Sequence, residues 1–301
     1  MNILTTTSSF CINEFPKEIN VIHNPFKRRL TEDEVLDLIE KYQPIGMIAG
    51  IEPLTRKVLE KARNLKIISR CGIGVDSLDM EAAKELDIKV TITPDAPMVS
   101  VAELTLGLIL GLLRRINTLD AGMRRGGWKG PKGNLLSDKI VGIIGCGRIG
   151  TYVARLAVAF GCKIMGYDPF VKDHDICSIG DLGKLLKESD IVTLHVPYSR
   201  DNHHLIAGKE LNTMKSNAIL INAARGGLVD EVALCDALRD GVIAGAAMDC
   251  FEMEPYSGPL TGLENTLLTP HMGSSASEAR VMMEKQALDN LVDELKRLNI
   301  L

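Results

Sequence analysis

The sequence of 301 residues has few aromatic side chains and no surplus of positive charge. Phe, Trp and Tyr make up 4% of it, and the formal net charge is −4. Nucleic-acid and membrane binding usually need an excess of Lys and Arg, so we expect neither partner. A content of 46% hydrophobic and 25% charged residues is typical of a globular protein, and the length suffices for two domains.

The seven cysteines show no spacing typical of a metal site or a disulfide framework. They are scattered and form no CxxC pair, at positions 11, 71, 146, 162, 177, 235 and 250. An odd number of scattered cysteines is typical of reduced thiols in a cytosolic protein. We therefore expect a cytoplasmic location and no metal site.

Neither a signal peptide nor a membrane span is indicated. Residues 1–10 lack the basic start and the long apolar core of a secretory signal. The apolar run Leu104–Leu113 is too short to cross a bilayer and is flanked by Glu103 and Arg114. We predict that this run is a buried helix.

What the chain does have is a glycine motif directly after an apolar run. Val141–Ile144 leads into a G-x-G-x-x-G, and a second apolar run ends at Asp168. Gly145 permits the turn, Gly147 permits the approach of a pyrophosphate, and Gly150 permits helix and strand to pack closely. Free amides at the helix start favour the anion, and Asp168 suits a ribose hydroxyl. The motif predicts a dinucleotide site, with a glycine turn between core elements as the alternative.

Apolar runs alternate with helical patterns along most of the chain, which predicts an α/β fold with parallel sheets. In the first third we predict strands at Asn2–Thr6, Ile45–Ala49, Lys66–Ser69 and Ile88–Ile92. Later strands are predicted at Lys139–Ile144, Lys163–Tyr167, Asp190–His195, Ala218–Asn222, Val242–Met248 and Thr266–Thr269. Capping boxes predict helices that begin at Thr31–Glu34, Ser100–Glu103 and Ser275–Glu278. Gly241 is expected to end a helix over Asp230–Asp240.

The glycine motif lies in the middle of the chain, so we expect its domain to be inserted into another α/β domain. Pro94–Pro97 is a rigid break suited to a hinge. We predict two doubly wound parallel-sheet domains. A Rossmann NAD domain spans residues 98–274, and a flavodoxin-like substrate domain combines residues 1–97 with 275–301.

Three polar side chains that follow predicted strands could carry chemistry. Arg225 lies among small residues, and its planar guanidinium can hold a carboxylate. His271 could carry a proton near neutral pH. Glu254, in an acidic stretch with Asp249 and Glu252, could orient the histidine and favour its protonated form. A surface arginine, a structural histidine and a solvated acidic loop are the alternatives on spacing alone.

Taken together, these motifs resemble those of the D-isomer-specific 2-hydroxyacid dehydrogenases. The resemblance covers nearly the whole chain in matching order, and it rests on Gly145–Gly150 with Asp168, Asn222–Gly226, Asp249–Pro255 and Thr269–Gly273. It implies that Arg225 binds the substrate carboxylate and carbonyl. His271 would be the acid/base and Glu254, which directly precedes a proline, its partner.

The resemblance also implies the cofactor. NAD is expected rather than NADP, because Asp168 would repel a 2′-phosphate. Asp249 matches an aspartate that lies close to the nicotinamide carboxamide in the family. We assign to the cofactor site Gly145, Gly147, Arg148, Ile149, Gly150, Asp168, His195, Pro197, Ala223, Asp249 and Gly273. A homodimer is implied as well, with the helix from Val101 and the loop holding Trp128 at the interface.

The first domain contains a segment, Ser69–Asp76, that resembles the family's substrate loop. Its glycines would present backbone N–H groups to a carboxylate. The substrate-binding residues would be Arg70, Gly72, Ile73 and Gly74. Arg70 matches an arginine of many D-3-phosphoglycerate dehydrogenases, the members that the chain resembles most, although the C-terminal regulatory domain of many of them is not expected. Arg56 and Lys57 are candidates for a substrate phosphate.

We therefore expect an NAD-dependent oxidoreductase that interconverts a small D-2-hydroxy acid and its 2-keto acid. The resemblance favours 3-phosphoglycerate and 3-phosphohydroxypyruvate, the substrates of serine biosynthesis. Glyoxylate/hydroxypyruvate reductase and D-lactate dehydrogenase are alternatives within the class. Formate dehydrogenase is disfavoured, because that branch has glutamine where Glu254 stands. NAD-sensing corepressors that bind partner peptides are the alternative of another class.

Overall fold

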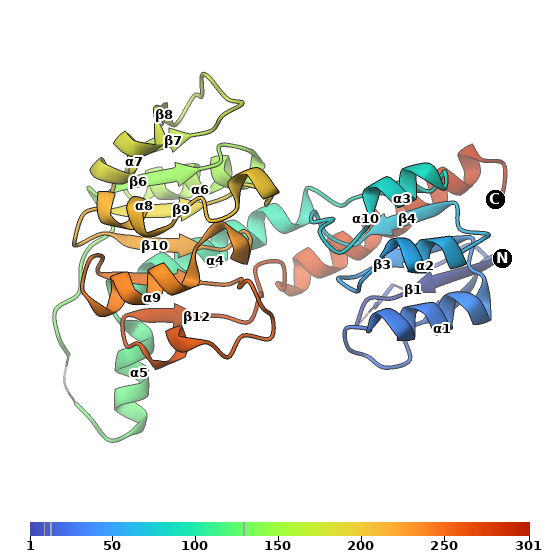
Figure 1. Ribbon diagram of the computed structural model, residues 1–301, viewed down its shortest axis with the longest axis horizontal. Coiled ribbons are helices and arrows are strands. Elements are labelled where there is room, and N and C mark those ends of the chain that lie inside the picture. Colours follow the sequence, from blue (N-terminus) through green and yellow to red (C-terminus); the bar gives the residue numbers. More distant parts are fainter. Residues whose placement is uncertain (9, 13, 129) are drawn as a thin grey trace. The chain divides into compact units, whose positions relative to one another are not determined.

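The computed structural model describes residues 1–8, 10–12, 14–128 and 130–301 (Figure 1). The chain divides into two compact units. Unit 1 comprises Met1–Pro97 and Ser274–Leu301, and unit 2 comprises Met98–Gly273. Unit 2 is therefore inserted into unit 1 along the chain, which passes between the two units twice.

Unit 1 contains a five-stranded parallel sheet in the order β2-β1-β3-β4-β5, which is the flavodoxin-like order. Its strands are β1 (Asn2–Thr5), β2 (Asn20–His23), β3 (Gly46–Ala49), β4 (Ile67–Arg70) and β5 (Lys89–Thr91). Its helices are α1 (Glu32–Tyr42), α2 (Arg56–Lys61), α3 (Met80–Glu85) and α10 (Ser277–Arg297).

Helices cover both faces of this sheet, because successive side chains of a strand point to opposite sides. Leu4 and Met47 pack with α1, α2 and α3 on one face. Their neighbours Ile3 and Ile48 pack with α10 on the other. The last helix of the chain thus supplies one of the two layers that bury the first strands.

Unit 2 contains a seven-stranded parallel sheet in the order β12-β11-β10-β9-β6-β7-β8. Its strands are β6 (Ile140–Ile144), β7 (Lys163–Tyr167), β8 (Ser178–Ile179), β9 (Ile191–Leu194), β10 (Ile219–Asn222), β11 (Gly245–Met248) and β12 (Thr266–Leu268). The strand order reverses between β6 and β9. In doubly wound sheets a dinucleotide binds beyond the carboxyl ends of the strands at this switch point.

Helices cover both faces of the unit 2 sheet as well. The helices of this unit are α4 (Ala96–Leu113), α5 (Ile116–Arg124), α6 (Arg148–Ala159), α7 (Leu182–Glu188), α8 (Gly208–Thr213) and α9 (Glu231–Arg239), and α5 contributes no buried residue. Ile143 packs with α4 and α6, and its neighbour Ile144 packs with α7, α8 and α9. Short 3-10 turns are η1 (Arg200–Asn202), η2 (Gly226–Leu228) and η3 (Pro259–Gly262).

The predicted strands are all present, with ends that differ from the prediction by at most three residues. The sequence patterns missed β2 and β8. Both are edge strands, with the sequences NVIH and SI and partly exposed side chains. Such short edges carry no apolar run that would distinguish them from a loop.

One predicted helix start is confirmed and two are wrong. Thr31 and Glu34 form the capping box of α1. Ser100 does not begin α4, because the helix already starts at Ala96, and the Ser100 hydroxyl donates instead to the Gly273 carbonyl, 2.7 Å away. Ser275 does not begin α10 either, since Ala276 occupies the N-cap position without a side-chain bond. Pro97 also lies inside α4, so the predicted break at Pro94–Pro97 is a helix start.

Helix α4 contains the apolar run that was predicted to be buried. Among the described residues it is the one helix long and apolar enough to cross a membrane, and 61% of it is buried within the structure. Ala102, Leu106 and Ile109 belong to the core on one face of the unit 2 sheet. The hydropathy of α4 is therefore that of a core helix.

Candidate active site

The three glycines of the loop between β6 and α6 differ in their surroundings. Gly145 has a φ of 99°, a left-handed conformation that favours glycine. A Cβ on Gly150 would lie 1.9 Å from the Gly145 carbonyl oxygen, so only glycine fits there. A Cβ on Gly147 would meet no heavy atom within 4 Å. The loop is thus open at Gly147, where the first amides of α6 point outward. Arg148 and Ile149 are the first residues of that helix.

Asp168 lies directly after β7 and is tied to the glycine loop. Its carboxylate accepts the backbone N–H of Cys146 and that of Phe170, each at 2.9 Å. These bonds fix the carboxylate beside the loop, at the carboxyl ends of the parallel strands. An acid at this place suits a ribose hydroxyl and opposes a phosphate.

Two histidines follow strands of unit 2, and they differ in their environment. His195 comes directly after β9, and its ring nitrogen lies 2.9 Å from the Thr193 hydroxyl. Burial lowers the pKa of His195 to about 3, so its ring is neutral near pH 7. His195 can therefore shape the cofactor site but is poorly suited to exchange protons at neutral pH. Pro197 and Ala223 follow β9 and β10 at the same edge of the sheet.

His271 lies in the turn after β12 and is paired with a carboxylate. Its Nδ1 is 2.9 Å from both carboxylate oxygens of Glu254. Glu254 Oε1 also accepts the backbone N–H of Phe251 at 3.0 Å, which fixes the carboxylate. Because Glu254 occupies Nδ1, Nε2 is the nitrogen left to exchange a proton. The structure thus brings together the predicted acid/base and its predicted partner.

Asp249 holds the turn that carries His271. It is 1% exposed, and its two carboxylate oxygens accept three hydrogen bonds from that turn. The donors are the Thr269 hydroxyl at 2.7 Å and the backbone N–H groups of Met272 and Gly273, each at 2.8 Å. A Cβ on Gly273 would lie 3.1 Å from Asp249 Oδ2, so the turn packs tightly on the carboxylate. Asp249 therefore positions His271 by organising its backbone.

Arg225 follows β10 and is carried by a turn that Asn222 shapes. The buried Asn222 side chain donates to the Arg225 carbonyl at 2.8 Å and accepts the Ala224 N–H at 3.1 Å. Arg225 Nη1 donates to the Ala224 carbonyl at 2.6 Å. The guanidinium is therefore held next to the carboxyl end of β10. Asn222 was not predicted as a site residue, although an asparagine that ends a buried strand before small residues was a usable signal.

Gly226 packs the Arg225 turn directly against the turn that carries Glu254. A Cβ on Gly226 would lie 1.9 Å from the carbonyl carbon of Phe251 and 2.1 Å from its oxygen. No side chain can therefore come between the two turns. This contact explains how residues far apart in sequence form one site at the edge of the unit 2 sheet.

The predicted substrate loop of unit 1 follows β4. Gly72 has a φ of 141°, and its N–H donates to the hydroxyl of the buried Thr93 at 2.8 Å. The part of the chain that the structure describes offers no acceptor for the amides of Ile73 and Gly74. The amides of Ile73 and Gly74 could bind an anion, whereas the predicted Gly72 amide is already engaged by Thr93. Thr93, which anchors the loop, carries no sequence signal that would have revealed it.

Arg70 is largely engaged in shaping this loop. It is 8% exposed, and it donates to the carbonyls of Gly74 at 2.9 Å, Cys71 at 2.6 Å and Ala49 at 3.3 Å. The candidates for a substrate phosphate, Arg56 and Lys57, pair on the surface with Glu85 at 2.5 Å and Asp33 at 3.3 Å. Direct phosphate binding by these side chains thus gains no support from their contacts.

The cysteines near the two sites are not poised as nucleophiles. Burial is the main cause that raises the pKa of Cys71 to about 11 and that of Cys250 above its usual range. A thiol reacts as its thiolate, which such burial disfavours. Neither Cys71 nor Cys250 is therefore a candidate nucleophile.

Comparison with known proteins identifies the class. Residues 106–273 match the model of the D-isomer specific 2-hydroxyacid dehydrogenase NAD binding domain. The chain belongs to this family of oxidoreductases, and unit 2 contains its NAD-binding domain.

Individual relatives of the chain bear several names. It is 43% identical over 277 residues to a D-3-phosphoglycerate dehydrogenase of Methanocaldococcus jannaschii, covering 89% of this chain and 52% of that protein. It is 38% identical to a hydroxypyruvate reductase of Thermotoga maritima, covering 88% and 89%. It is 41% identical to a glyoxylate reductase of Thermococcus litoralis, covering 85% and 82%. The chain thus spans about half the length of the D-3-phosphoglycerate dehydrogenase.

Solved structures agree with this assignment. The TT0316 protein of Thermus thermophilus superposes with a TM-score of 0.88 at 35% identity, covering 98% of this chain and 97% of that one. A D-lactate dehydrogenase of Aquifex aeolicus, complexed with NAD and lactic acid, superposes with a TM-score of 0.83 at 26% identity, covering 100% and 96%. Each covers both units of the chain, so the inserted arrangement of the NAD-binding domain is that of the family.

Proposed function

We propose that the protein interconverts a small D-2-hydroxy acid and its 2-keto acid with NAD as the hydride carrier. The observation that carries the proposal is the pairing of His271 Nδ1 with both oxygens of Glu254 at 2.9 Å, beside Arg225 at the same sheet edge. A cation that holds a carboxylate and a histidine poised for proton transfer are what this reaction needs.

The glycine loop fits the cofactor sterically. The open space at Gly147 leaves room for the pyrophosphate, and Asp168 stands where a ribose hydroxyl donates. NAD, when bound, supplies the site for hydride transfer to and from carbon 2 of the substrate. Gly145, Arg148, Ile149 and Gly150 complete the cradle. His195, Pro197, Ala223, Asp249 and Gly273 surround the neighbouring strand ends and belong to the same proposed site.

The residues of unit 2 divide the chemical work. Arg225 binds the substrate carboxylate and polarises the oxygen on carbon 2. In oxidation, neutral His271 accepts the hydroxyl proton at Nε2; in reduction, the imidazolium returns it to the carbonyl oxygen. Glu254 stabilises the imidazolium and fixes the ring. In the unit 1 loop that Arg70 shapes, the backbone amides of Ile73 and Gly74 would bind a carboxylate. The Gly72 amide is already engaged by Thr93, so the contribution of Gly72 would be its left-handed backbone conformation.

We propose 3-phosphohydroxypyruvate and 3-phosphoglycerate as the first substrates to test. The 43% identity to a D-3-phosphoglycerate dehydrogenase supports them. Hydroxypyruvate and glyoxylate are supported by the other two relatives. A panel of these keto acids with pyruvate, followed by NADH absorbance, ranks them by kcat/KM. Absence of turnover with every 2-keto acid, combined with binding of a partner peptide, would contradict the proposed enzyme and favour an NAD-sensing binding protein.

Cofactor choice gives a prediction about Asp168. The wild-type protein should prefer NADH over NADPH, because the carboxylate repels the 2′-phosphate. Asp168→Asn removes that charge and should lower the ratio of kcat/KM with NADH to kcat/KM with NADPH by about tenfold. The ratio of kcat/KM values for the two cofactors measures this. Asp173→Asn, an exposed acid in the following loop, is the matched control. Equal use of both cofactors by the wild type would contradict the assignment.

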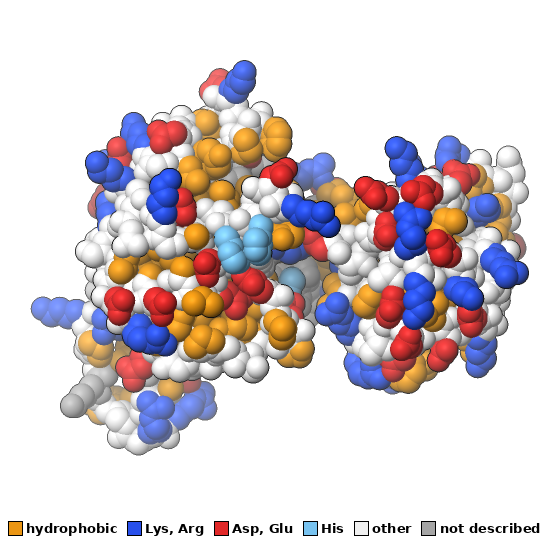
Figure 2. Space-filling view, viewed as in Figure 1, with side chains coloured by type: hydrophobic (Ala, Val, Ile, Leu, Met, Phe, Trp, Pro, Cys, Tyr) orange, Lys and Arg blue, Asp and Glu red, His pale blue; other side chains and the backbone are white. Residues whose placement is uncertain are grey.

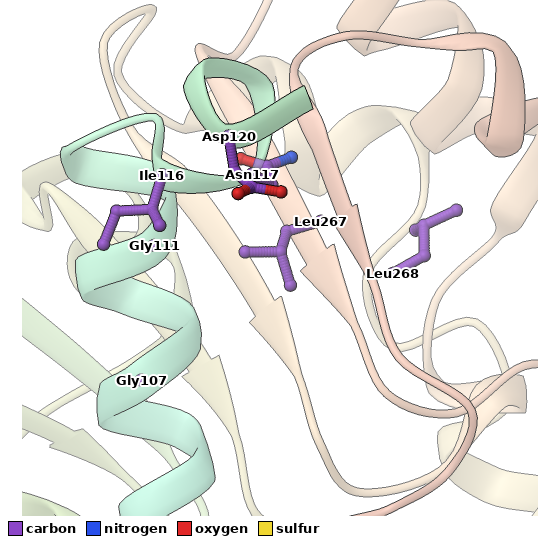
Figure 3. A pocket seen from close by; sticks show the side chains of 7 residues that line it. All are labelled: Gly107, Gly111, Ile116, Asn117, Asp120, Leu267 and Leu268. Carbon is purple, nitrogen blue, oxygen red and sulfur yellow. The ribbon is translucent and has the colours of Figure 1, made fainter. Parts of the chain in front are cut away.

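We also propose that the protein is a homodimer through α4, α5 and the following residues Arg125–Trp128. Figure 3 shows a hollow on this side of unit 2, lined by glycines of α4, the start of α5 and β12, whose residues are Gly107, Gly111, Ile116, Asn117, Asp120, Leu267 and Leu268. Ile116, Met123 and Trp128 are 56%, 51% and 87% exposed. No residue of α5 is buried in this chain. A second copy would cover these apolar side chains.

Sizing tests the dimer. Light scattering should give twice the chain mass of 32.8 kDa at micromolar concentration. The double variant Ile116→Glu with Trp128→Glu should be monomeric, because charge would be buried at the interface. Val232→Glu, a substitution of an exposed side chain on α9, is the control and should stay dimeric. A monomeric wild type would refute the proposal.

The seven free cysteines support the further proposal of a cytoplasmic location.

A further inference from the structure

A second histidine–carboxylate pair lies near the catalytic pair in unit 2. His204 Nε2 is 2.6 Å from Glu252 Oε1, and His204 Nδ1 is 3.9 Å from Asp230 Oδ2. Figure 2 shows histidine side chains grouped on the surface of this unit with acidic side chains beside them. The described residues form no group of three or more side chains suited to hold a metal ion. The pair therefore needs another explanation.

The His204 ring is held in place from several directions. Its backbone has a φ of 55°, and its N–H donates to the Gly227 carbonyl at 2.8 Å. Its ring stacks on that of His203 with centroids 3.8 Å apart. His203 in turn meets Tyr198 edge-on, with 3.3 Å between Nδ1 and the hydroxyl. A surface histidine fixed in this way is more ordered than its exposure alone suggests.

Glu252 connects this histidine to the catalytic turn. The Glu252 N–H donates to Glu231 Oε1 at 2.7 Å, and the preceding N–H, of Phe251, donates to Glu254 Oε1 at 3.0 Å. The same turn therefore carries Glu252 toward His204 and Glu254 toward His271. Gly227, which accepts from His204, is two residues from Arg225. His204 thus contacts both turns that carry the proposed catalytic residues.

Negative charge is crowded at this turn. Burial is the main cause that raises the pKa of Glu231, the nearby carboxylates of Glu252 and Glu254 raise it further, and His204 opposes them. The charged groups that face His204 are Asp230, Glu231 and Glu252, and its stacked neighbour is His203. His204 therefore opposes part of the negative charge that Glu252 and Glu254 exert on Glu231 in this turn.

We propose that His204 is a positioning residue, which through Glu252 holds the 251–254 turn and tunes the electric field on the His271–Glu254 pair. The inference rests on the proposed function of that pair. Glu252 then pairs with the positioning residue His204, whereas Glu254 pairs with His271. The exposed fractions of the His204 and Glu252 side chains are 32% and 40%, so substitutions there leave the core intact.

The two members of the pair should shift the titration of His271 in opposite directions. His204→Gln leaves Glu252 unbalanced, which stabilises the imidazolium of His271 and raises its midpoint. Glu252→Gln removes a negative charge and lowers the midpoint. Two unit charges roughly 10 Å apart in water interact by about 0.4 kcal/mol, so we expect shifts on the order of 0.3 pH unit. His204→Lys restores a cation and should return the midpoint to the wild-type value or below it. Molar salt should shrink these shifts.

Histidine NMR of the 301-residue chain measures these midpoints without turnover. The pH profile of kcat/KM for keto-acid reduction is the second measurement. Glu264→Gln is the matched control, because this exposed acid precedes β12 whereas His271 follows it, at the opposite edge of the sheet. Opposite shifts with an unmoved control support the proposal. Equal midpoints in all variants, or shifts of one sign for both substitutions, overturn it. Full activity in His271→Ala would instead overturn the proposed function of the catalytic pair.

Discussion

Replacement of His271 by alanine should lower kcat for keto-acid reduction by about 10²–10⁴-fold, the usual contribution of a positioned acid or base. The carbonyl oxygen would then receive its proton from water, while the Arg225 site for the carboxylate stays intact. We expect NADH binding to be almost unchanged, because the glycine loop follows β6 whereas His271 follows β12. Stopped-flow NADH oxidation and fluorescence titration separate the two effects.

Companion variants sharpen this test. Glu254→Gln keeps a hydrogen bond to Nδ1 but loses the charge that stabilises the imidazolium. Its kcat for reduction should therefore fall less than that of His271→Ala, and the fall should grow as the pH rises. Reduction needs protonated His271, so the wild-type rate falls as pH rises through the titration of this ring. His23→Ala removes an exposed histidine of unit 1 and serves as the control. Retention of full activity by His271→Ala would exclude the assignment.

Replacement of Arg225 by glutamine should lower kcat/KM by about 10²–10³-fold, because a carboxylate loses its charged partner at a partly buried site. Arg225→Lys keeps the charge but loses the planar pair of donors, so we expect KM to rise more than kcat falls. Steady-state kinetics with the best keto acid of the panel measures both. Arg239→Gln on α9, whose arginine pairs with the exposed Asp236 at 3.1 Å, is the control. A variant at Arg225 with unchanged KM and kcat would refute the role.

Much of this architecture could be predicted because local chemistry and global fold agree. The glycine pattern of residues 145–150 specifies a turn, an open approach and a close helix–strand contact, and each is present. Arg225 and His271 could be located because parallel strands bring their carboxyl ends to one edge of a sheet. The pairing of His271 with Glu254 rather than Glu252 followed from the resemblance, since spacing alone left both acids open.

Other features depend on contacts that no local pattern encodes. Ser100 and Ser275 satisfy the spacing of a capping box, yet tertiary packing starts both helices elsewhere. Asp249 has the composition of a solvated acidic stretch but is buried under the His271 turn by three hydrogen bonds. Asn222 and Thr93 support the site from positions that only the folded chain reveals. Such supporting residues are long-range by nature, and a single sequence does not distinguish them from ordinary polar residues.

Because α10 follows unit 2 along the chain, unit 1 can complete its fold only after unit 2 has been synthesised. Met283, Ala287 and Leu291 of α10 complete the apolar layer against Ile3 and Ile48. As the ribosome releases the chain, residues 1–97 emerge about 180 residues before this layer is available, or roughly ten to forty seconds at usual elongation rates. During that interval one face of the first sheet lacks its covering helix. The nascent protein therefore exposes apolar strands to chaperones, while the inserted NAD-binding domain can already fold from a continuous segment.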